Sequence, residues 1–225
     1  MKPYYDHAGI TIFHGDAREV LPTLDAGSID LLLADPPYGM NWDSDSTRFT
    51  GGVKPEIRRG AGRNDWPAIA NDDMPFDPSP WLVFPRVVLW GYNHFAQRLP
   101  LGTILVWIKK RPGLFGTFLS DAEIAWMKGG HGVYCFEKQF PPPSRMMEGS
   151  GRCLHPTQKP LSLMAWCIVK SKMPNGGLIL DPFMGSGTTL RAAKDAGCRA
   201  IGVEICEAYC EIAVKRLAQG VFDWS

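Results

Sequence analysis

The chain has no apolar run long enough to cross a membrane, no marked excess of either charge and no closely spaced cysteine pair. The first absence excludes an ordinary membrane-spanning helix. No signal-peptide pattern follows Met1, so we expect a cytoplasmic protein. Basic and acidic side chains number 24 and 23, a net charge of +1 that excludes an overall polybasic nucleic-acid binder. Any surface that contacts nucleic acid must therefore be local.

The six cysteines are scattered, and none belongs to a C-x-x-C pair. Cys206 and Cys210 are one helical turn apart, and Cys153 with His155 has a spacing that metal ligands also show. We interpret the six instead as reduced thiols, several of which fill the core. The sequence thus predicts neither a disulfide framework nor a metal site.

What the 225 residues do contain is an alternation of short apolar runs and helical patterns. The strand-like runs are 10–16, 29–38, 86–93, 103–110, 122–128, 132–138, 177–183 and 199–205. The helical patterns are 159–172, 184–197 and 207–220, with a short helix or turn over 17–28. Such alternation predicts a single α/β domain over residues 1–225, with a doubly wound, mostly parallel sheet.

Two helical patterns have an apolar stripe. Pro160 is placed for a helix start, and Leu161, Met164, Ala165 and Ile168 share one face of the helix that follows. The last helix has the stripe Tyr209, Ile212, Ala213 and Leu217. We expect these faces to cover the sheet, and Gly197 to end the helix between them.

One stretch shows no period. Residues 41–80 are rich in Gly, Asp, Arg and Pro, and we interpret them as a long loop or flexible insertion. Within it, residues 46–64 hold five basic side chains and one acid, a net of five minus one, or +4. This segment could face phosphates, or it could be a solvated loop. The basic side chains are Arg48, Lys54, Arg58, Arg59 and Arg63, and the acid is Glu56.

The segment "LILDPFMGSGTT" runs from a buried strand through a glycine turn into a helix. In open α/β sheets this is where ligands bind, because glycines let the backbone approach a cofactor closely. A phosphate-binding P-loop would need Lys where Thr188 stands, and a dinucleotide motif would need Gly where Leu190 stands. The remaining interpretation is an adenosylmethionine pocket.

An acid, Glu204, ends the next strand, 23 residues after Asp181. That spacing suits a carboxylate that accepts both hydroxyl groups of an adenosine ribose. The structural alternatives are a turn or N-cap role for Asp181 and a solvated strand end for Glu204. Strand, glycine turn, helix, strand and acid together favour the cofactor site.

The apolar run at 29–38 ends in Asp35, Pro36, Pro37 and Tyr38. An exocyclic amine of a nucleobase is a poor nucleophile, because its lone pair is delocalised into the ring. The Asp35 carboxylate and the Pro36 carbonyl can accept its two N–H groups, and paired prolines fix that carbonyl's direction. Tyr38 offers a face on which a flipped base stacks. Taken alone, the four residues could also be a simple strand-to-turn junction.

Together these motifs resemble the DNA amino-methyltransferases. The catalytic motif "DPPY" precedes the cofactor motif "DPFMGSGTT", which is the order of the β class of phage and bacterial enzymes. The resemblance implies a Rossmann-like, S-adenosylmethionine-dependent methyltransferase fold with a circularly permuted motif order. It implies catalytic roles for Asp35, Pro36, Pro37 and Tyr38. Cofactor contacts are implied for Asp16, His155, Thr157, Gln158, Lys159, Asp181, Pro182, Phe183, Gly185, Ser186, Gly187, Thr188 and Glu204.

The "HPTQKP" segment, residues 155–160, is expected by this resemblance near the methionine end of the cofactor. There Lys159 or backbone groups would hold the cofactor carboxylate. Asp16 would lie near the adenine. No metal is expected, since the sulfonium already activates the methyl group.

The implied activity is methyl transfer to the exocyclic N6 of adenine in double-stranded DNA, with the target base flipped. The motif D-P-P-Y favours adenine in this family, and S-P-P-Y favours cytosine. The alternatives are N4-cytosine transfer, an RNA or protein amine methyltransferase, and a non-catalytic DNA-binding protein. Partners implied are a second copy in a homodimer and a cognate restriction endonuclease, in a bacterial or phage setting. Residues 138–154 form a short recognition segment, which predicts a short or relaxed target sequence.

Overall fold

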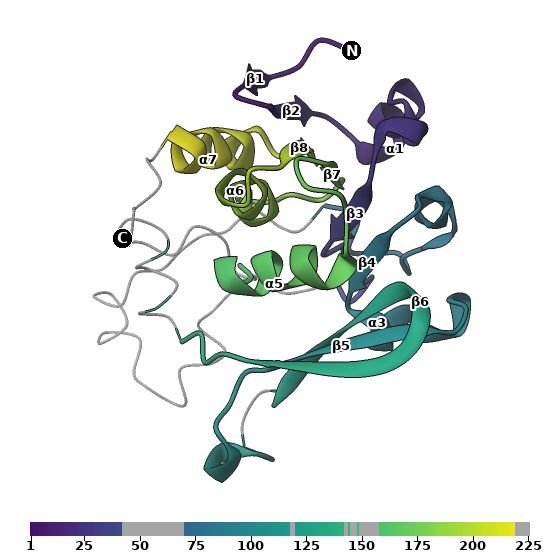
Figure 1. Ribbon diagram of the computed structural model, residues 1–225, viewed down its shortest axis with the longest axis vertical. Helices are drawn as coiled ribbons and strands as arrows, with labels where there is room; N and C mark the ends of the chain where they lie inside the picture. Colours follow the sequence, from purple (N-terminus) through teal and green to yellow (C-terminus); the bar gives the residue numbers. More distant parts are fainter. Residues whose placement is uncertain (42–69, 118–119, 142–143, 145–147, 149–157, 219–225) are drawn as a thin grey trace.

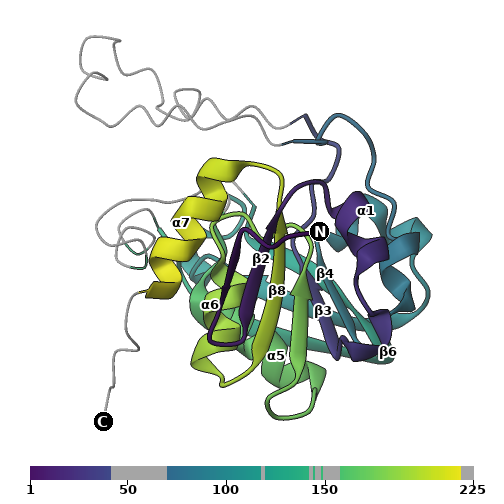
Figure 2. The ribbon, with the colours of Figure 1, turned by 90° about the horizontal axis from the view of Figure 1, so that it is seen from above.

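The computed structural model describes residues 1–41, 70–117, 120–141, 144, 148 and 158–218. Its centre is one eight-stranded sheet with helices on both faces (Figures 1 and 2). The strands are β1 (Tyr5–His7), β2 (Ile10–His14), β3 (Leu31–Ala34), β4 (Val87–Trp90), β5 (Gly102–Ile108), β6 (Ala122–Glu137), β7 (Leu178–Asp181) and β8 (Arg199–Glu204). The α-helices are α1 (Ala17–Val20), α3 (Tyr92–Phe95), α5 (Leu161–Ser171), α6 (Thr188–Asp195) and α7 (Glu207–Ala218), and short 3-10 turns join several of them.

The strand order is β1-β2-β8-β7-β3-β4-β6-β5. Neighbouring strands from β2 to β4 run parallel, whereas β1 and the first half of β6 run antiparallel to their neighbours. The chain leaves β3 toward β4 and leaves β7 toward β8, so the winding direction reverses between β3 and β7. Open α/β sheets bind their ligands at such a reversal, outside the carboxyl ends of the strands.

The sheet is covered on both faces, which explains the continuous apolar run of β3. Leu31 and Leu33 face a core built with α5, α6 and α7, and Leu32 and Ala34 face a second core with α1 and the turn at Ser79–Val83. All four are buried. Figure 2 shows α5, α6 and α7 on one side of the sheet and α1 on the other. The predicted doubly wound, mostly parallel α/β sheet is confirmed.

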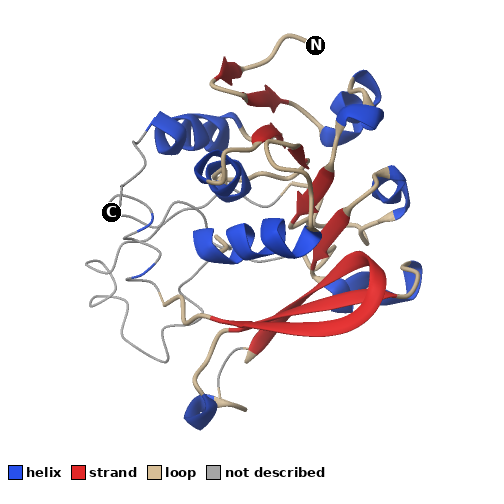
Figure 3. Cartoon of the chain, in the orientation of Figure 1, coloured by secondary structure: helices blue, strands red, loops and turns tan. Residues whose placement is uncertain are grey.

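The two apolar runs at 122–128 and 132–138 form one long element, β6, rather than two strands. It curls at Gly129 and Gly130, whose φ angles are +82° and +68°. Its first half pairs with β5 in the opposite direction, from Thr103 with Met127 to Ile108 with Ala122. Its second half pairs with the other side of β5 in the same direction, so β6 wraps around β5 (Figure 3).

The predicted helix stripes are partly correct. In α5, Met164 and Ile168 are buried and Leu161 and Ala165 half-buried, while Leu163 and Cys167 share the buried face. In α7, Tyr209, Ala213 and Leu217 are buried and Ile212 is half-buried; Cys210 and Arg216 are buried as well. Gly197, with φ +66°, follows α6 as expected. Two of the cysteines, Cys167 and Cys210, are core residues as predicted.

Of the predicted insertion at 41–80, the part 42–69 lies outside the described residues, together with the basic segment 46–64. Residues 70–80 pack against the sheet domain, with Asp72 and Phe76 buried. The recognition segment 138–154 is described only at 138–141, 144 and 148. Within the described parts of the chain, no helix combines the length and apolar character that a membrane crossing requires.

Candidate active site

Four acids lie at or just beyond the carboxyl ends of adjacent parallel strands. The register pairs His14 of β2 with Glu204 of β8, and Asp181 of β7 with Gly202 of β8. On the other side, β7 pairs with β3, and Asp35 follows β3 directly. Asp16 comes two residues after β2. The two motifs therefore meet on one edge of the sheet, at the reversal between β3 and β7.

Both oxygens of Asp35 are engaged. The hydroxyl of Tyr38 donates to Oδ1, and the ammonium of Lys159 contacts Oδ2. Pro36 is buried and Pro37 half-buried beside them. The Asp35 side chain keeps a fifth of its surface exposed, so one side of the carboxylate is open to an incoming group.

The ring of Tyr38 lies parallel to the imidazole of His94, with centroids 4.6 Å apart and planes 8° apart. Gly91 makes room for it, since a Cβ there would lie 2.0 Å from Tyr38 Cε1. Burial, reinforced by the Asp35 charge, raises the pKa of Tyr38 well above its usual value. Burial also lowers the pKa of His94, which favours the neutral imidazole. The turn that follows Asp35 thus presents a neutral, pre-formed aromatic stack.

Asp72, a buried carboxylate, holds the backbone of the turn at Tyr38–Met40 in place. Its Oδ1 accepts the backbone N–H groups of Tyr38, Gly39 and Met40, at 2.9, 2.8 and 3.2 Å. The paired prolines leave few donors in this turn, and Asp72 satisfies those that remain. This contact fixes the path of the chain beyond Tyr38.

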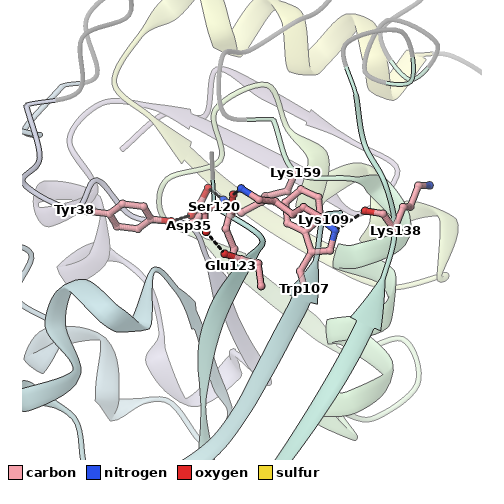
Figure 4. A network of polar contacts seen from close by, with 9 residues as sticks. Asp35, Tyr38, Trp107, Lys109, Ser120, Glu123, Lys138 and Lys159 are labelled. Atoms are coloured by element: carbon pink, nitrogen blue, oxygen red, sulfur yellow. Dashed lines mark hydrogen bonds and ion pairs between the residues drawn. The ribbon is translucent and has the colours of Figure 1, made fainter. Parts of the chain in front are cut away.

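Behind Asp35, charges alternate along a chain of side chains (Figure 4). Lys159 Nζ is 3.2 Å from Glu123 Oε2, and Glu123 Oε1 accepts from Lys109 at 2.8 Å. Burial alone would raise the pKa of Glu123, but the charges of Lys159 and Lys109 outweigh it and hold that pKa at about 2. Burial alone would lower the pKa of Lys159, but Asp35 and Glu123 raise it above its usual value. Glu123 and Lys159 are therefore both charged at neutral pH.

The glycine turn lies between β7 and α6. Asp181 is 3% exposed, and its Oδ1 accepts the backbone N–H of Phe183 at 3.1 Å. Burial raises the pKa of Asp181 to about 7, against hydrogen bonds that lower it. Gly185 and Gly187 have φ angles of +50° and +77°, which favour glycine. Pro182 and Ser186 are buried, and Phe183 packs edge-on against Trp81.

Glu204 is tied to the same turn. Its carboxylate accepts the N–H of Gly185 at 2.9 Å and that of Cys206 at 2.8 Å. Burial raises its pKa, while these backbone hydrogen bonds lower it. A carboxylate has about four acceptor positions, so Glu204 retains capacity for a ligand's hydroxyl groups.

Arg216 of α7 supports the turn from the far side. Its Nη1 donates to the Ser186 carbonyl, the Ser186 hydroxyl and the Thr188 hydroxyl, at 2.9, 3.1 and 3.0 Å. The side chain is 4% exposed, and burial lowers its pKa to about 10. It is still charged at neutral pH.

Asp16 forms the N-cap of α1 and accepts the Arg18 N–H at 2.8 Å. It also pairs with the Arg18 guanidinium at 2.6 Å, and that hydrogen bond lowers its pKa. Gln158 is buried, and neither polar atom of its amide has a hydrogen-bond partner among the described residues. His155 and Thr157 lie outside the described residues. Among the described residues, no cluster of three or more His, Cys, Asp or Glu could hold a metal ion.

The sequence reasoning missed five residues of this region: His94, Asp72, Glu123, Lys109 and Arg216. No local motif surrounds them, since each reaches the site from a different element. Lys159 was expected beside the cofactor's methionine, and the structure places its ammonium on Asp35.

Comparison with known proteins gives concordant results. Residues 137–215 match the N6_N4_Mtase family model, described as DNA methylase. The type II methyltransferase M.ScaI of Streptomyces caespitosus is 28% identical, over 98% of this chain and 86% of its own length. The DNA adenine methyltransferase YhdJ of Escherichia coli K12 is 29% identical, over 92% of this chain and 82% of its own length.

Solved structures agree in fold. The M1.HpyAVI–SAM complex matches with a TM-score of 0.56 and 22% identity, covering 92% of this chain and 99% of that one. The cytosine-N4-specific PvuII DNA methyltransferase matches with a TM-score of 0.62 and 16% identity, covering 99% and 91%. Family model and relatives together confirm the resemblance to the N6/N4 DNA methylases, while the placement in the β class stays a prediction. The chain is a relative of the N6/N4 DNA methylases and hence a DNA amino-methyltransferase of the N6 or N4 type.

Proposed function

We propose that this protein transfers a methyl group from S-adenosylmethionine to the N6 amine of an adenine flipped out of double-stranded DNA. The observation that carries the proposal is the meeting of Asp35 and Pro36 with the Asp181 turn at the β3–β7 reversal. An amine acceptor and a cofactor turn thereby share one edge of the sheet. Adenine is preferred because the turn begins with Asp rather than Ser.

The edge fits S-adenosylmethionine on its own chemistry. Glu204 is anchored to Gly185 and keeps acceptor capacity for the ribose, and Gly185 and Gly187 leave two positions of the turn without side chains. Asp181 is a buried acid without a basic partner in the described structure, and a cationic ligand would compensate its charge. When bound, the cofactor supplies a methyl group on a positively charged sulfur. Asp16 would lie on the side of Glu204, toward β2.

The chain's own residues then act on the base. The Asp35 carboxylate and the Pro36 carbonyl accept the two amine hydrogens, which directs the nitrogen lone pair away from the ring. These acceptors are already fixed, so they need not reorganise as charge develops on the nitrogen. Tyr38, backed by His94, provides the stacking face for the base.

Labelled methyl transfer to DNA, tRNA and protein tests the proposal, followed by nucleoside analysis of the product. We expect N6-methyladenine in DNA only. Transfer of equal efficiency to N4 of cytosine would refute the adenine assignment, and transfer to tRNA or protein alone would refute the DNA assignment. Asp35→Ala should bind S-adenosylmethionine as the wild type does and transfer no methyl group.

The cellular setting is part of the proposal. The relatives include type II methyltransferases, so we infer a role in bacterial or phage restriction–modification, in the cytoplasm, beside a cognate endonuclease. The short recognition segment 138–154 leads us to expect a short or relaxed target, and methylation mapping on random-sequence DNA tests that. Light scattering tests the expected homodimer.

A further inference from the structure

We propose that Lys159 is a positioning residue for the catalytic carboxylate of Asp35, and that Glu123, braced by Lys109, fixes Lys159 in turn. The inference rests on the proposed function and deepens it. It assigns Lys159 to the reacting amine's side of the site rather than to the cofactor's methionine.

The first support is the location of the Lys159 ammonium. The side chain is 6% exposed, and Nζ lies between Asp35 Oδ2 and Glu123 Oε2, the latter at 3.2 Å. The Trp90 ring lies beneath, 6.0 Å from Nζ to its centroid. An ammonium has three hydrogens to donate, and two of its directions are taken by carboxylates. A cofactor carboxylate would be a third anion in the same buried place.

The second support is the rigidity of the brace. Glu123 lies in β6 and pairs with Trp107 of the neighbouring strand β5. Lys109 comes directly after the last residue of β5. The backbone N–H of Lys109 also donates to the Asp121 carbonyl at 2.9 Å. Lys109 Nζ meets the second Glu123 oxygen at 2.8 Å. The ammonium of Lys159 is thus located by two sheet strands, which hold a side chain more precisely than a loop does.

The third support is charge. Lys109, Glu123, Lys159 and Asp35 alternate in sign and sum to zero. Removal of Lys159 leaves two carboxylates in a partly buried place without the charge that separates them. Asp35 then has no partner at Oδ2 and can turn away from the amine's position.

The arrangement also divides the two oxygens of Asp35. Lys159 holds Oδ2, while the one described partner of Oδ1 is the Tyr38 hydroxyl, a neutral group that a substrate can displace. The base amine is therefore accepted at Oδ1, in place of that hydroxyl. Lys159 fixes which oxygen faces the substrate.

Single-turnover methylation and calorimetry on the full chain test this role with Lys159→Met, which removes the charge and keeps the length. We expect the transfer rate at saturating S-adenosylmethionine to fall about 100-fold, the scale of a misplaced catalytic group. The cofactor Kd should stay within about twofold of the wild type. Lys159→Arg, which keeps the charge, should recover a measurable part of the rate. Lys110→Met is the matched control, because Lys110 also forms a partly buried ion pair, with Asp121.

Glu123→Gln completes a double-mutant cycle. If Glu123 acts through Lys159, the substitution Glu123→Gln lowers the transfer rate about tenfold in the wild-type background. The same substitution has little further effect in the Lys159→Met background. Thermal melting establishes that each variant is folded. If Lys159→Met does not fold, the transfer rates of the two single variants Lys159→Arg and Glu123→Gln decide whether Lys159 positions Asp35.

Three results would overturn the proposal. One is an unchanged rate in Lys159→Met. Another is a tenfold weaker cofactor Kd with an unchanged saturated rate, since Lys159 would then bind the cofactor. The third is full additivity in the double-mutant cycle, in which Glu123→Gln lowers the transfer rate by the same factor in the wild type and in Lys159→Met. A wild type that transfers no methyl group to DNA would refute the proposed function instead. In that case crystal structures decide the inference: Asp35 should change rotamer in Lys159→Met and keep it in Lys110→Met.

Discussion

Asp181 makes the stability of this protein depend on pH in a direction opposite to that of most carboxylates. Its pKa is raised by burial from an ordinary 3.8 to about 7 in the folded chain. As pH rises between these values, the unfolded chain releases the proton and the folded chain retains it, so the folded state loses stability across this window. Three pKa units correspond to an upper limit of about 4 kcal/mol. Asp181→Asn cannot ionise and escapes this loss.

Urea unfolding of the wild type and Asp181→Asn at pH 5 and pH 8 measures the effect. We expect the variant's stability relative to the wild type to increase by about 1–3 kcal/mol between the two pH values, since water penetration reduces the upper limit. All other titrating groups are common to both proteins and cancel in the difference. A difference that is constant with pH, or that falls as pH rises, would refute the assignment of a protonated, buried Asp181. Because a cation favours the ionised form, S-adenosylmethionine should also lose more affinity below pH 7 in the wild type than in the variant.

Three further substitutions probe the supports of the site. Arg216→Met removes three hydrogen bonds from the glycine turn, and calorimetry should show about tenfold weaker cofactor binding, together with a lower Tm. Gly91→Ala places a Cβ against the Tyr38 ring at a φ of +81°, so transfer should fall at least tenfold while cofactor affinity is kept; equal activity would show that the stack is dispensable. Asp72→Ala leaves three backbone N–H groups without their acceptor, and denaturant unfolding should show a loss of about 1–3 kcal/mol.

The fold and the two motifs were readable from the sequence because their signals are local. The apolar run before Asp35 and the strand–glycine–helix pattern after Leu178 each fall within about ten residues, and each fixes one strand and the turn that follows. The parallel sheet then brings the two turns together, because carboxyl ends of parallel strands lie on one edge. Neither step requires knowledge of long-range side-chain contacts.

The supports of the site could not be read in this way. Lys159, Glu123 and Lys109 come from three elements, and Glu123 meets Lys109 only once β5 pairs with the first half of β6. Before the register is known, Glu123 looks like any polar residue at the start of a strand. The curl of β6 at Gly129 and Gly130 was the reason that two strands were expected where the structure has one.

Arg216 illustrates a different limit. By pattern it belongs to the polar part of an amphipathic helix, where a basic residue near the C-terminus is expected to face solvent. The structure buries it because the glycine turn presents carbonyl and hydroxyl oxygens to α7, and Arg216 is the donor that satisfies them. Amphipathic patterns rank residues by their hydrophobicity and so overlook buried polar groups that serve a neighbouring turn.

The four acids along this edge of the sheet differ in whether they have a basic partner. Asp35 and Asp16 each have a basic partner, Lys159 and Arg18. Asp181 and Glu204 are met by backbone N–H groups and by no basic side chain within hydrogen-bonding reach in the described structure. Asp35, the catalytic acid of the proposed function, is therefore compensated before any ligand arrives, and it would accept a neutral amine without an electrostatic change. Asp181 and Glu204 lack such a partner, so in the proposed function the positive charge of the methyl donor would complete this part of the site.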